Sequence, residues 1–194
     1  IDENYILIFN GEIYNYIELK KNLEAKGIYT KTKSDTEILL MYYKIYGEKC
    51  VNFFDGMWSF IIFNKKNEKL FASRDMFGEK PLYYYQDYDG LYFGSETKFI
   101  RKLDGDSITI NGNKLLRYLA FGYKSLNKDN ETFYRGITEI EYATNLTISP
   151  DLECSAERYW NPIEIPPDPR IRVQDAIEGA RHYLIRSMKM RARA

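Results

Sequence analysis

An Asn-Gly pair at the end of an apolar stretch is the first feature of the sequence that could carry chemistry. Residues 5–9 are all apolar and rich in β-branched and aromatic types, which predicts a buried strand. Asn10 and Gly11 are expected to end that strand, because both tolerate positive φ. A carboxamide donor beside a backbone N–H could form an oxyanion hole, which stabilises negative charge on a reacting carbonyl oxygen. The alternative is a strand-to-helix turn in which Asn-Gly serves backbone geometry alone.

A second polar group, around residues 34–37, opens a predicted helix. Ser34 and Glu37 have the spacing of a capping box, in which each side chain binds the backbone amide of the other residue. Asp35 would lie in the first helical turn, where the helix dipole favours an acidic residue. These three residues therefore have a structural interpretation that requires no substrate.

Hydrophobic periodicity predicts the elements that must position these groups. The first strand is followed by a helix over 13–26, a short half-exposed strand over 28–33 and a helix over 36–46. Consecutive strands and hairpin signals such as Asp89-Gly90 then indicate antiparallel pairing and an α+β fold. The remaining predicted elements are strands over 57–64, 70–73, 82–86, 91–94 and 140–148, helices over 95–101 and 115–121, and an extended piece over 158–160.

Clustered prolines divide the chain near its C-terminal end. We expect one domain over 1–161, a stiff proline-rich linker over 162–172, and the first helix of another domain over 173–194. Because the chain starts at Ile1 rather than Met and ends within a helical pattern, we interpret it as a piece of a longer protein.

Composition excludes several classes of function. The formal net charge is zero, so there is no electrostatic footprint for binding nucleic acid. No apolar run approaches the roughly 18 residues that span a bilayer, and no secretory signal is visible. The two cysteines, Cys50 and Cys154, lie far apart without a CxxC pattern, which is typical of unpaired thiols in a reducing compartment. We therefore expect a cytoplasmic protein that binds neither nucleic acid nor membrane, and no metal site.

Five strings of residues together resemble one enzyme family. They closely resemble the glutaminase domain of glutamine-hydrolysing asparagine synthetases, which are class II amidotransferases of the N-terminal-nucleophile hydrolase superfamily. The resemblance runs from residue 1 to the C-terminus. The strings are Phe9-Asn10-Gly11-Glu12-Ile13-Tyr14-Asn15-Tyr16, Ser34-Asp35-Thr36-Glu37, Asp55-Gly56-Met57-Trp58, Ser73-Arg74-Asp75-Met76-Phe77-Gly78-Glu79-Lys80-Pro81-Leu82-Tyr83-Tyr84 and Phe93-Gly94-Ser95-Glu96-Thr97-Lys98.

The resemblance implies a fold and a substrate. The fold would be a four-layer αββα sandwich of two antiparallel sheets, lacking its first strands. The substrate would be glutamine: Asn10 and Gly11 match the oxyanion-hole positions, and Glu12 and Asp35 match carboxylates around the glutamine α-ammonium group. Arg74, Asp75 and Lys80 are interpreted as structural.

The resemblance also implies parts that this chain does not contain. The family's nucleophile is an N-terminal cysteine, and residue 1 is Ile, so we expect the chain alone to be inactive. The chain needs no cofactor of its own. ATP and Mg²⁺ are expected in a C-terminal synthetase domain, which would be the partner that uses the ammonia on an aspartyl intermediate.

Several alternatives stay open at this point. The chain could be a non-catalytic scaffold related to amidotransferases, or an unrelated α+β binding module whose motifs match by accident. The acceptor could be aspartate or another carboxylate. The oligomeric state, for which a homodimer is one option, is also open.

Overall fold

The structure is a computed structural model that describes residues 3–123 and 129–193. Its contacts divide the chain into two compact units. The first unit contains residues 1–11 and 58–158, and the second contains residues 12–57 and 159–194. Strand β1 (Tyr5–Ile13) therefore begins in the first unit, and its last two residues belong to the second.

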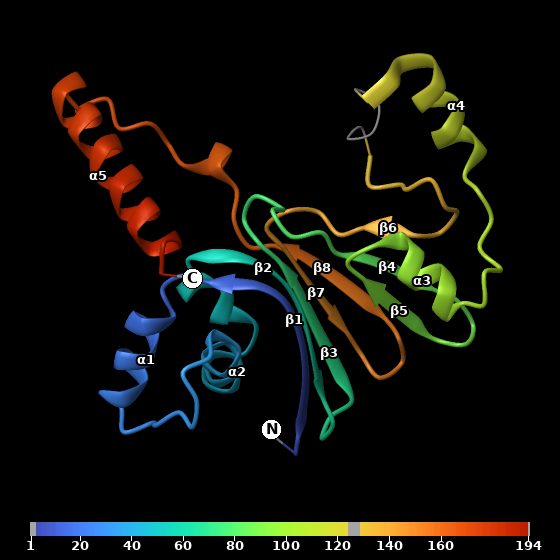
Figure 1. Ribbon diagram of the computed structural model, residues 1–194, viewed down its shortest axis with the longest axis horizontal. Coiled ribbons are helices and arrows are strands. Elements are labelled where there is room, and N and C mark those ends of the chain that lie inside the picture. The colour runs from blue at the N-terminus through green and yellow to red at the C-terminus, as the bar shows by residue number, and fades with distance from the viewer. Residues whose placement is uncertain (1–2, 124–128, 194) are drawn as a thin grey trace. The chain divides into compact units, whose positions relative to one another are not determined.

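A five-stranded antiparallel sheet forms the framework of the first unit (Figure 1). In β2 and β3, Ser59 lies opposite Arg74 and Asn64 opposite Lys69, so these strands form the expected hairpin. Strand β3 then pairs with β7, which is distant in sequence, and β7 pairs with β8. The strand order is β1, β2 (Gly56–Asn64), β3 (Lys69–Arg74), β7 (Thr144–Ile148) and β8 (Cys154–Arg158).

A second antiparallel sheet contains β5 (Leu91–Gly94), β4 (Tyr83–Gln86) and β6 (Thr138–Glu139), in that order. The backbone N–H of Asp87 donates to the carbonyl of Gly90 at 3.0 Å, which closes the hairpin between β4 and β5. The hairpin predicted at Asp89-Gly90 is therefore confirmed.

The small sheet buries side chains on both faces because successive residues of a strand point in opposite directions. Tyr84, Leu91 and Phe93 pack with residues of the large sheet, among them Ala72 and Leu146. The residues that alternate with these in β4 and β5 point to the opposite face, where they pack around the fully buried Ile100 of α3. The residues on that face are Tyr83, Tyr85 and Tyr92. The first unit also contains the helices α3 (Thr97–Leu103) and α4 (Gly112–Phe121).

The second unit is mainly helical. Leu19 and Leu23 of α1 are buried, as are Ile38 and Leu39 of α2, as expected for amphipathic helices. The Tyr42 hydroxyl donates to the Leu19 carbonyl at 3.3 Å, which links the two helices. The helices are α1 (Tyr16–Glu24), α2 (Asp35–Tyr46), the 3-10 segments Gly47–Phe53 and Pro162–Glu164, and α5 (Val173–Arg191).

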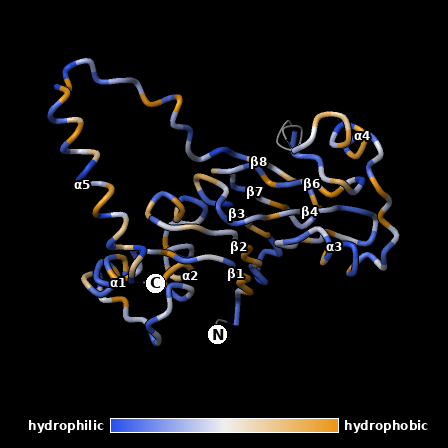
Figure 2. The backbone as a smooth tube through the Cα atoms, turned by 45° about the horizontal axis from the view of Figure 1, so that its top comes forward, coloured by the Kyte–Doolittle hydropathy of each residue, from blue (hydrophilic) through white to orange (hydrophobic). Residues whose placement is uncertain are grey.

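Helix α5 is largely exposed along its length. Hydrophobic and hydrophilic residues both occur along it in Figure 2, and the exposed ones include Ile177, Leu184 and Met188. It is anchored toward its C-terminal end, where Met190 is buried, the Arg191 guanidinium lies over the Tyr14 ring, and Arg186 pairs with Asp55 at 3.7 Å.

The predicted α+β fold with two antiparallel sheets is confirmed, but several boundaries were wrong. Strand β1 continues through Asn10 and Gly11 to Ile13, so the following helix starts at Tyr16. The first strand is also not buried as predicted, because Ile6 and Ile8 are 47% and 65% exposed.

Two predicted extended segments were also wrong. Residues 28–33 form no strand, because the Glu37 carboxylate binds the backbone N–H groups of Lys31 and Thr32 at 2.8 and 2.7 Å and takes the place of a neighbouring strand. The last strand of the large sheet is Cys154–Arg158 rather than an extended piece over 158–160, and the strand predicted over 140–148 begins only at Thr144.

Candidate functional site

Asn10 lies in β1 with an exposed side chain. Its Nδ2 donates a hydrogen bond to Oγ of Ser95 at 3.1 Å. Ser95 follows the end of β5, so this bond connects a strand of the large sheet with the end of a strand of the small sheet, within the first unit. The carboxamide proposed to bind an oxyanion is therefore held by a hydroxyl on another element.

Gly11 continues β1 with a φ of 154°. Glycine adopts this conformation readily because it has no Cβ, whereas an L-residue does so rarely. The glycine therefore lets the strand pass from Asn10 to Glu12 in a geometry that other residues would strain.

Asn10 and Ser95 line a cleft of about 290 Å³ in the first unit. Ser59 is the other polar side chain of this lining, and the remaining lining side chains are apolar. They are Ile6, Ile8, Phe60, Ile61, Phe63, Leu70, Leu82, Leu91 and Phe93. The Asn10 amide thus borders a cleft that is lined mainly by apolar side chains.

Glu12, in the second unit, is placed by contacts of the end of β1 with the start of β2. A Cβ on Gly56 would lie 2.2 Å from the Glu12 carbonyl oxygen, so only glycine allows the backbones to approach this closely. Next to it, the Tyr14 N–H donates to the Asp55 carbonyl at 2.8 Å, and the Asn15 side chain accepts from the Asp55 N–H at 3.0 Å. Asn15 and Asp55-Gly56 thus hold the chain directly beside the end of the Asn-Gly-Glu string.

Asp35 is the first residue of α2, and its carboxylate faces the end of β1. Oδ2 accepts a hydrogen bond from the Ile13 N–H at 3.1 Å. Asp35 also lines a cleft of about 280 Å³ together with Glu12, Tyr14 and Ser34, and with Arg193 from the last described turn. The structure therefore brings Glu12 and Asp35, 23 positions apart in sequence, to one cleft of the second unit.

The predicted capping box is wrong in its second half. Ser34 caps α2 as expected, but its Oγ accepts from the Thr36 N–H, at 3.2 Å. Glu37 turns instead toward the preceding segment and binds Lys31 and Thr32. Although burial acts to raise it, the pKa of Glu37 is lowered by hydrogen bonds from Thr32 and Lys31. Glu37 therefore holds the loop before α2, with Asp35 left to face β1.

Neither cysteine is placed as an activated nucleophile. Cys50 lies in the 3-10 segment after α2 and is fully buried, and this burial raises the pKa of its thiol to about 12. Cys154 is exposed on β8, and partial desolvation raises the pKa of its thiol as well. Because the thiolate is the reactive form, both thiols are poorly suited to attack an amide at neutral pH.

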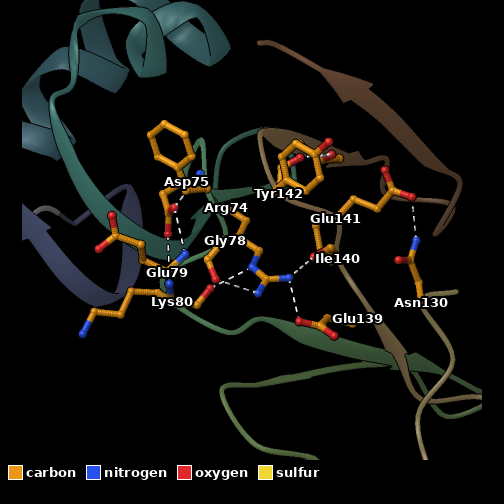
Figure 3. A network of polar contacts seen from close by, with 12 residues as sticks. Arg74, Asp75, Gly78, Glu79, Lys80, Asn130, Glu139, Ile140, Glu141 and Tyr142 are labelled. Atoms are coloured by element: carbon orange, nitrogen blue, oxygen red, sulfur yellow. Dashed lines mark hydrogen bonds and ion pairs between the residues drawn. The ribbon is translucent and has the colours of Figure 1, made fainter. Parts of the chain in front are cut away.

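The Arg74-Asp75 turn forms a closed polar network in the first unit (Figure 3). The Arg74 guanidinium donates to the carbonyls of Lys80, Gly78 and Ile140 and pairs with Glu139 at 2.8 Å. The buried Asp75 carboxylate accepts backbone N–H groups from both sides of the turn. Its donors are Trp58, Phe77, Glu79 and Lys80.

This network supports the structural interpretation of Arg74 and Asp75. A buried charge is costly unless it is paired and hydrogen-bonded, and here each charge binds several polar groups. Both side chains therefore serve to connect β2, β3, the turn after β3 and the end of β6.

Within the described residues, no group of three or more His, Cys, Asp or Glu side chains is arranged to hold a metal ion. The helices described are also too short or too polar for any of them to cross a membrane.

Solved structures define the class of this fold. The glutamine phosphoribosylpyrophosphate amidotransferase from Bacillus subtilis, complexed with ADP and GMP, aligns with a TM-score of 0.55 and 20% identity over 82% of this chain and 30% of that chain. A structure titled as the allosteric regulatory enzyme of purine biosynthesis aligns with a TM-score of 0.56 and 20% identity, over 82% of this chain and 29% of that chain. At this identity the likeness establishes the fold alone, which the chain shares with the aligned parts of these two structures.

The sequence places the chain in a family. The model of the glutamine amidotransferase domain matches residues 1–160, and the chain belongs to this family. It is similar to asparagine synthetase [glutamine-hydrolyzing] 1 of Bacillus subtilis strain 168, with 38% identity over 96% of this chain and 30% of that protein. Asparagine synthetase [glutamine-hydrolyzing] 3 of the same organism is 35% identical over 82% of this chain and 25% of its own length.

Two consequences follow from these matches. An accidental likeness of the motifs is excluded, because the family match covers most of the chain rather than five short strings. The chain spans about a third or less of the length of the curated relatives it matches.

Ser95 is the residue that sequence reasoning left without a role. It stands within Phe93-Gly94-Ser95-Glu96, one of the strings that carry the family resemblance, but nothing in the sequence connects it with Asn10, 85 positions away. The family string therefore included Ser95, but its hydrogen bond with Asn10 forms only when the two sheets are assembled.

Proposed function

We propose that this chain is the glutaminase part of an asparagine synthetase-like enzyme. It would bind glutamine for hydrolysis to glutamate and ammonia, and the ammonia would pass to an aspartyl group activated by ATP in another domain. The observation that carries the proposal is the Asn10-Gly11-Glu12 string at the end of β1, with Asp35 bound to the neighbouring Ile13. The relatives whose names specify glutamine-hydrolysing asparagine synthetases support it.

Asn10 and Gly11 are assigned to the oxyanion. The carboxamide Nδ2–H of Asn10 and the backbone N–H of Gly11 would donate to the carbonyl oxygen of the glutamine side chain as it becomes negatively charged. Donors of this kind act in the transition state more than in the ground state, so they raise kcat rather than improve substrate binding.

Glu12 and Asp35 are assigned to the α-ammonium group of glutamine. Both carboxylates line the same cleft in the second unit. A carboxylate that accepts a hydrogen bond from an ammonium group gains a charge-assisted bond, roughly twice as strong as a neutral one. Removal of either charge should therefore weaken glutamine binding.

The nucleophile is the part that this chain does not supply in an activated form. The pKa of Cys50 is about 12 and the thiol is buried, so the proposal requires a cysteine of the complete protein outside these 194 residues. We propose accordingly that the chain alone is inactive.

The domain assignment follows the same proposal. Residues 1–161 would be the glutaminase domain, 162–172 the linker and 173–194 the first helix of the synthetase domain. The exposed apolar residues of α5, such as Ile177 and Leu184, support this because they would be covered by that domain. ATP and Mg²⁺ would serve the synthetase domain, and no residue of this chain is assigned to them.

The test uses the complete protein encoded by the gene that contains this chain. Ammonia release from glutamine is measured first, and asparagine formation is then compared with glutamine and with ammonium as nitrogen source. We expect ATP-dependent asparagine formation with both sources. A protein that forms no ammonia from glutamine would contradict the proposal and would favour the alternative of a non-catalytic scaffold. Product analysis with other carboxylates identifies the acceptor.

A further inference from the structure

We propose that Ser95 is a positioning residue that fixes the carboxamide of Asn10 for oxyanion stabilisation. The inference rests on the proposed glutaminase function. Its basis is the hydrogen bond from Asn10 Nδ2 to Ser95 Oγ at 3.1 Å, within the first unit.

The geometry of a primary amide gives this bond its effect. The two N–H groups of Asn10 lie in one plane and point in different directions. When one N–H donates to Ser95, the other is directed away from the serine and is available to an oxyanion. Without this bond, an exposed asparagine side chain would rotate freely about χ2, whose energy profile is broad.

Ser95 can hold the amide because its own position is fixed. Gly94 ends β5, and a Cβ added there would lie 3.2 Å from the Glu96 carbonyl oxygen and 3.3 Å from Cγ1 of Ile100. Ile100 is completely buried in α3. The turn that carries Ser95 is therefore packed against the core of the small sheet and presents its hydroxyl from a rigid base.

The surroundings offer the Asn10 amide few other partners. Asn10 and Ser95 border a cleft whose other lining side chains, apart from Ser59, are apolar. Few polar groups of the protein therefore compete for the Asn10 amide. Precise donor placement matters most in this setting, because preorganised donors are worth more than flexible ones.

The first experiment compares Ser95→Ala and Ser95→Thr in the complete protein. Ser95→Ala should lower glutaminase kcat roughly tenfold, the effect of losing one hydrogen bond, while the KM for glutamine changes less than about twofold. Ser95→Thr keeps the hydroxyl and should retain most of the wild-type kcat. Ammonia-dependent asparagine formation should be the same in all three proteins. Ser107→Ala is the matched control, because Ser107 binds Asp104 in an exposed loop of the same unit.

A double-mutant cycle then asks whether Ser95 acts through Asn10. Adding Ser95→Ala to Asn10→Ala should change kcat by less than about twofold, since the group that Ser95 positions is already absent. An equal loss from Ser95→Ala with and without Asn10 would overturn the inference. A parallel loss of ammonia-dependent synthesis, or failure of Ser95→Thr to restore kcat, would overturn it as well.

These outcomes separate the inference from the proposed function. If Asn10→Ala loses glutaminase activity and Ser95→Ala keeps it, the inference alone fails. If the complete protein releases no ammonia from glutamine, the proposed function fails and the inference fails with it. If ammonia is released but Asn10→Ala leaves kcat unchanged, the assignment of Asn10 to the oxyanion fails, and the inference fails while the glutaminase function stands.

Discussion

The Asp35 carboxylate accepts a hydrogen bond from the backbone N–H of Ile13 at 3.1 Å, so the first residue of α2 is tied to the last residue of β1. The Asn-Gly-Glu string ends immediately before Ile13. Asp35, which is assigned to the substrate, therefore also supports the strand end that carries the other assigned residues. A substitution that tests its role in binding must keep the hydrogen bond to Ile13 and remove only the charge.

Asp35→Asn should raise the KM for glutamine more than it lowers kcat. The asparagine keeps an oxygen that can accept from Ile13 but removes the negative charge opposite the substrate ammonium group. Loss of a hydrogen bond to a charged group corresponds to roughly 10- to 100-fold weaker binding. Steady-state kinetics on the complete protein measures this, with Glu37→Gln as a control for charge in the same helical turn. An unchanged KM with a lower melting temperature would leave Asp35 with a structural role only.

Asn10→Ala should lower glutaminase kcat by roughly 10²- to 10³-fold, which is typical for the loss of one oxyanion-hole donor. Asparagine formation from ammonium should survive, because free ammonia bypasses the amide hydrolysis. The two activities are assayed side by side on the same preparation. If both fell equally, misfolding would be the better explanation and the assignment of Asn10 would be contradicted.

Glu37→Gln should make the protein less sensitive to acid. Hydrogen bonds from Thr32 and Lys31 hold the pKa of Glu37 below its ordinary value of 4.5, despite the opposing effect of burial. The folded state therefore binds fewer protons than the unfolded state near this pH. The contribution of Glu37 to the free energy of unfolding is present above pH 4.5 and is lost as the pH falls below it.

Urea unfolding at several acidic pH values measures this contribution. The stability of Glu37→Gln should fall less steeply with decreasing pH than that of the wild type. Glu24→Gln, which changes an exposed glutamate of α1, is the matched control. Identical slopes for all three proteins would show that Glu37 does not stabilise the loop before α2.

The two thiols should differ in reactivity. Cys154 is exposed and Cys50 is fully buried, so a thiol reagent at neutral pH should label Cys154 in the native protein and Cys50 only after denaturation. Peptide mapping after labelling identifies the modified residue. Rapid native labelling of Cys50 would mean that the 3-10 segment after α2 opens readily.

Burial of Cys50 should also make the protein sensitive to alkali. Its folded-state pKa of about 12 lies above the ordinary value of 9.0, so the folded state retains a proton that the unfolded state releases. This contribution to stability is complete below pH 9 and is lost as the pH rises toward 12. Cys50→Ala should therefore show a flatter stability profile above pH 9, even if the cavity lowers its stability at neutral pH.

The 194-residue chain alone should release no ammonia from glutamine, because it contains no activated thiol among its described residues. It should also be poorly stable, with the amides after Pro169 exchanging fastest. Helix α5 has an exposed apolar surface from Val173 to Met188, and isolated helices of this length are marginal in water. Hydrogen exchange and an ammonia assay on the purified chain test both points. Strong protection of α5 or measurable ammonia release would contradict them.

The sequence by itself determined the family, the α+β class and the local elements. Asn-Gly-Glu, Ser-Asp-Thr-Glu and Asp89-Gly90 carry their information in adjacent residues, and periodicity located α2, α4, α5 and most strands because side-chain burial repeats along a regular element.

The tertiary structure decided what depends on residues distant in sequence. Only assembly of the two sheets brings Ser95 to Asn10, and only the packing of α2 beside the end of β1 gives Asp35 the Ile13 amide as a partner. Residues 28–33 alternate like a strand, yet Glu37 accepts hydrogen bonds from the backbone amides of Lys31 and Thr32, which are therefore not paired with a neighbouring strand. Strand pairing and side-chain bonds of this kind are not periodic along the chain, because they depend on which backbone groups folding leaves within reach.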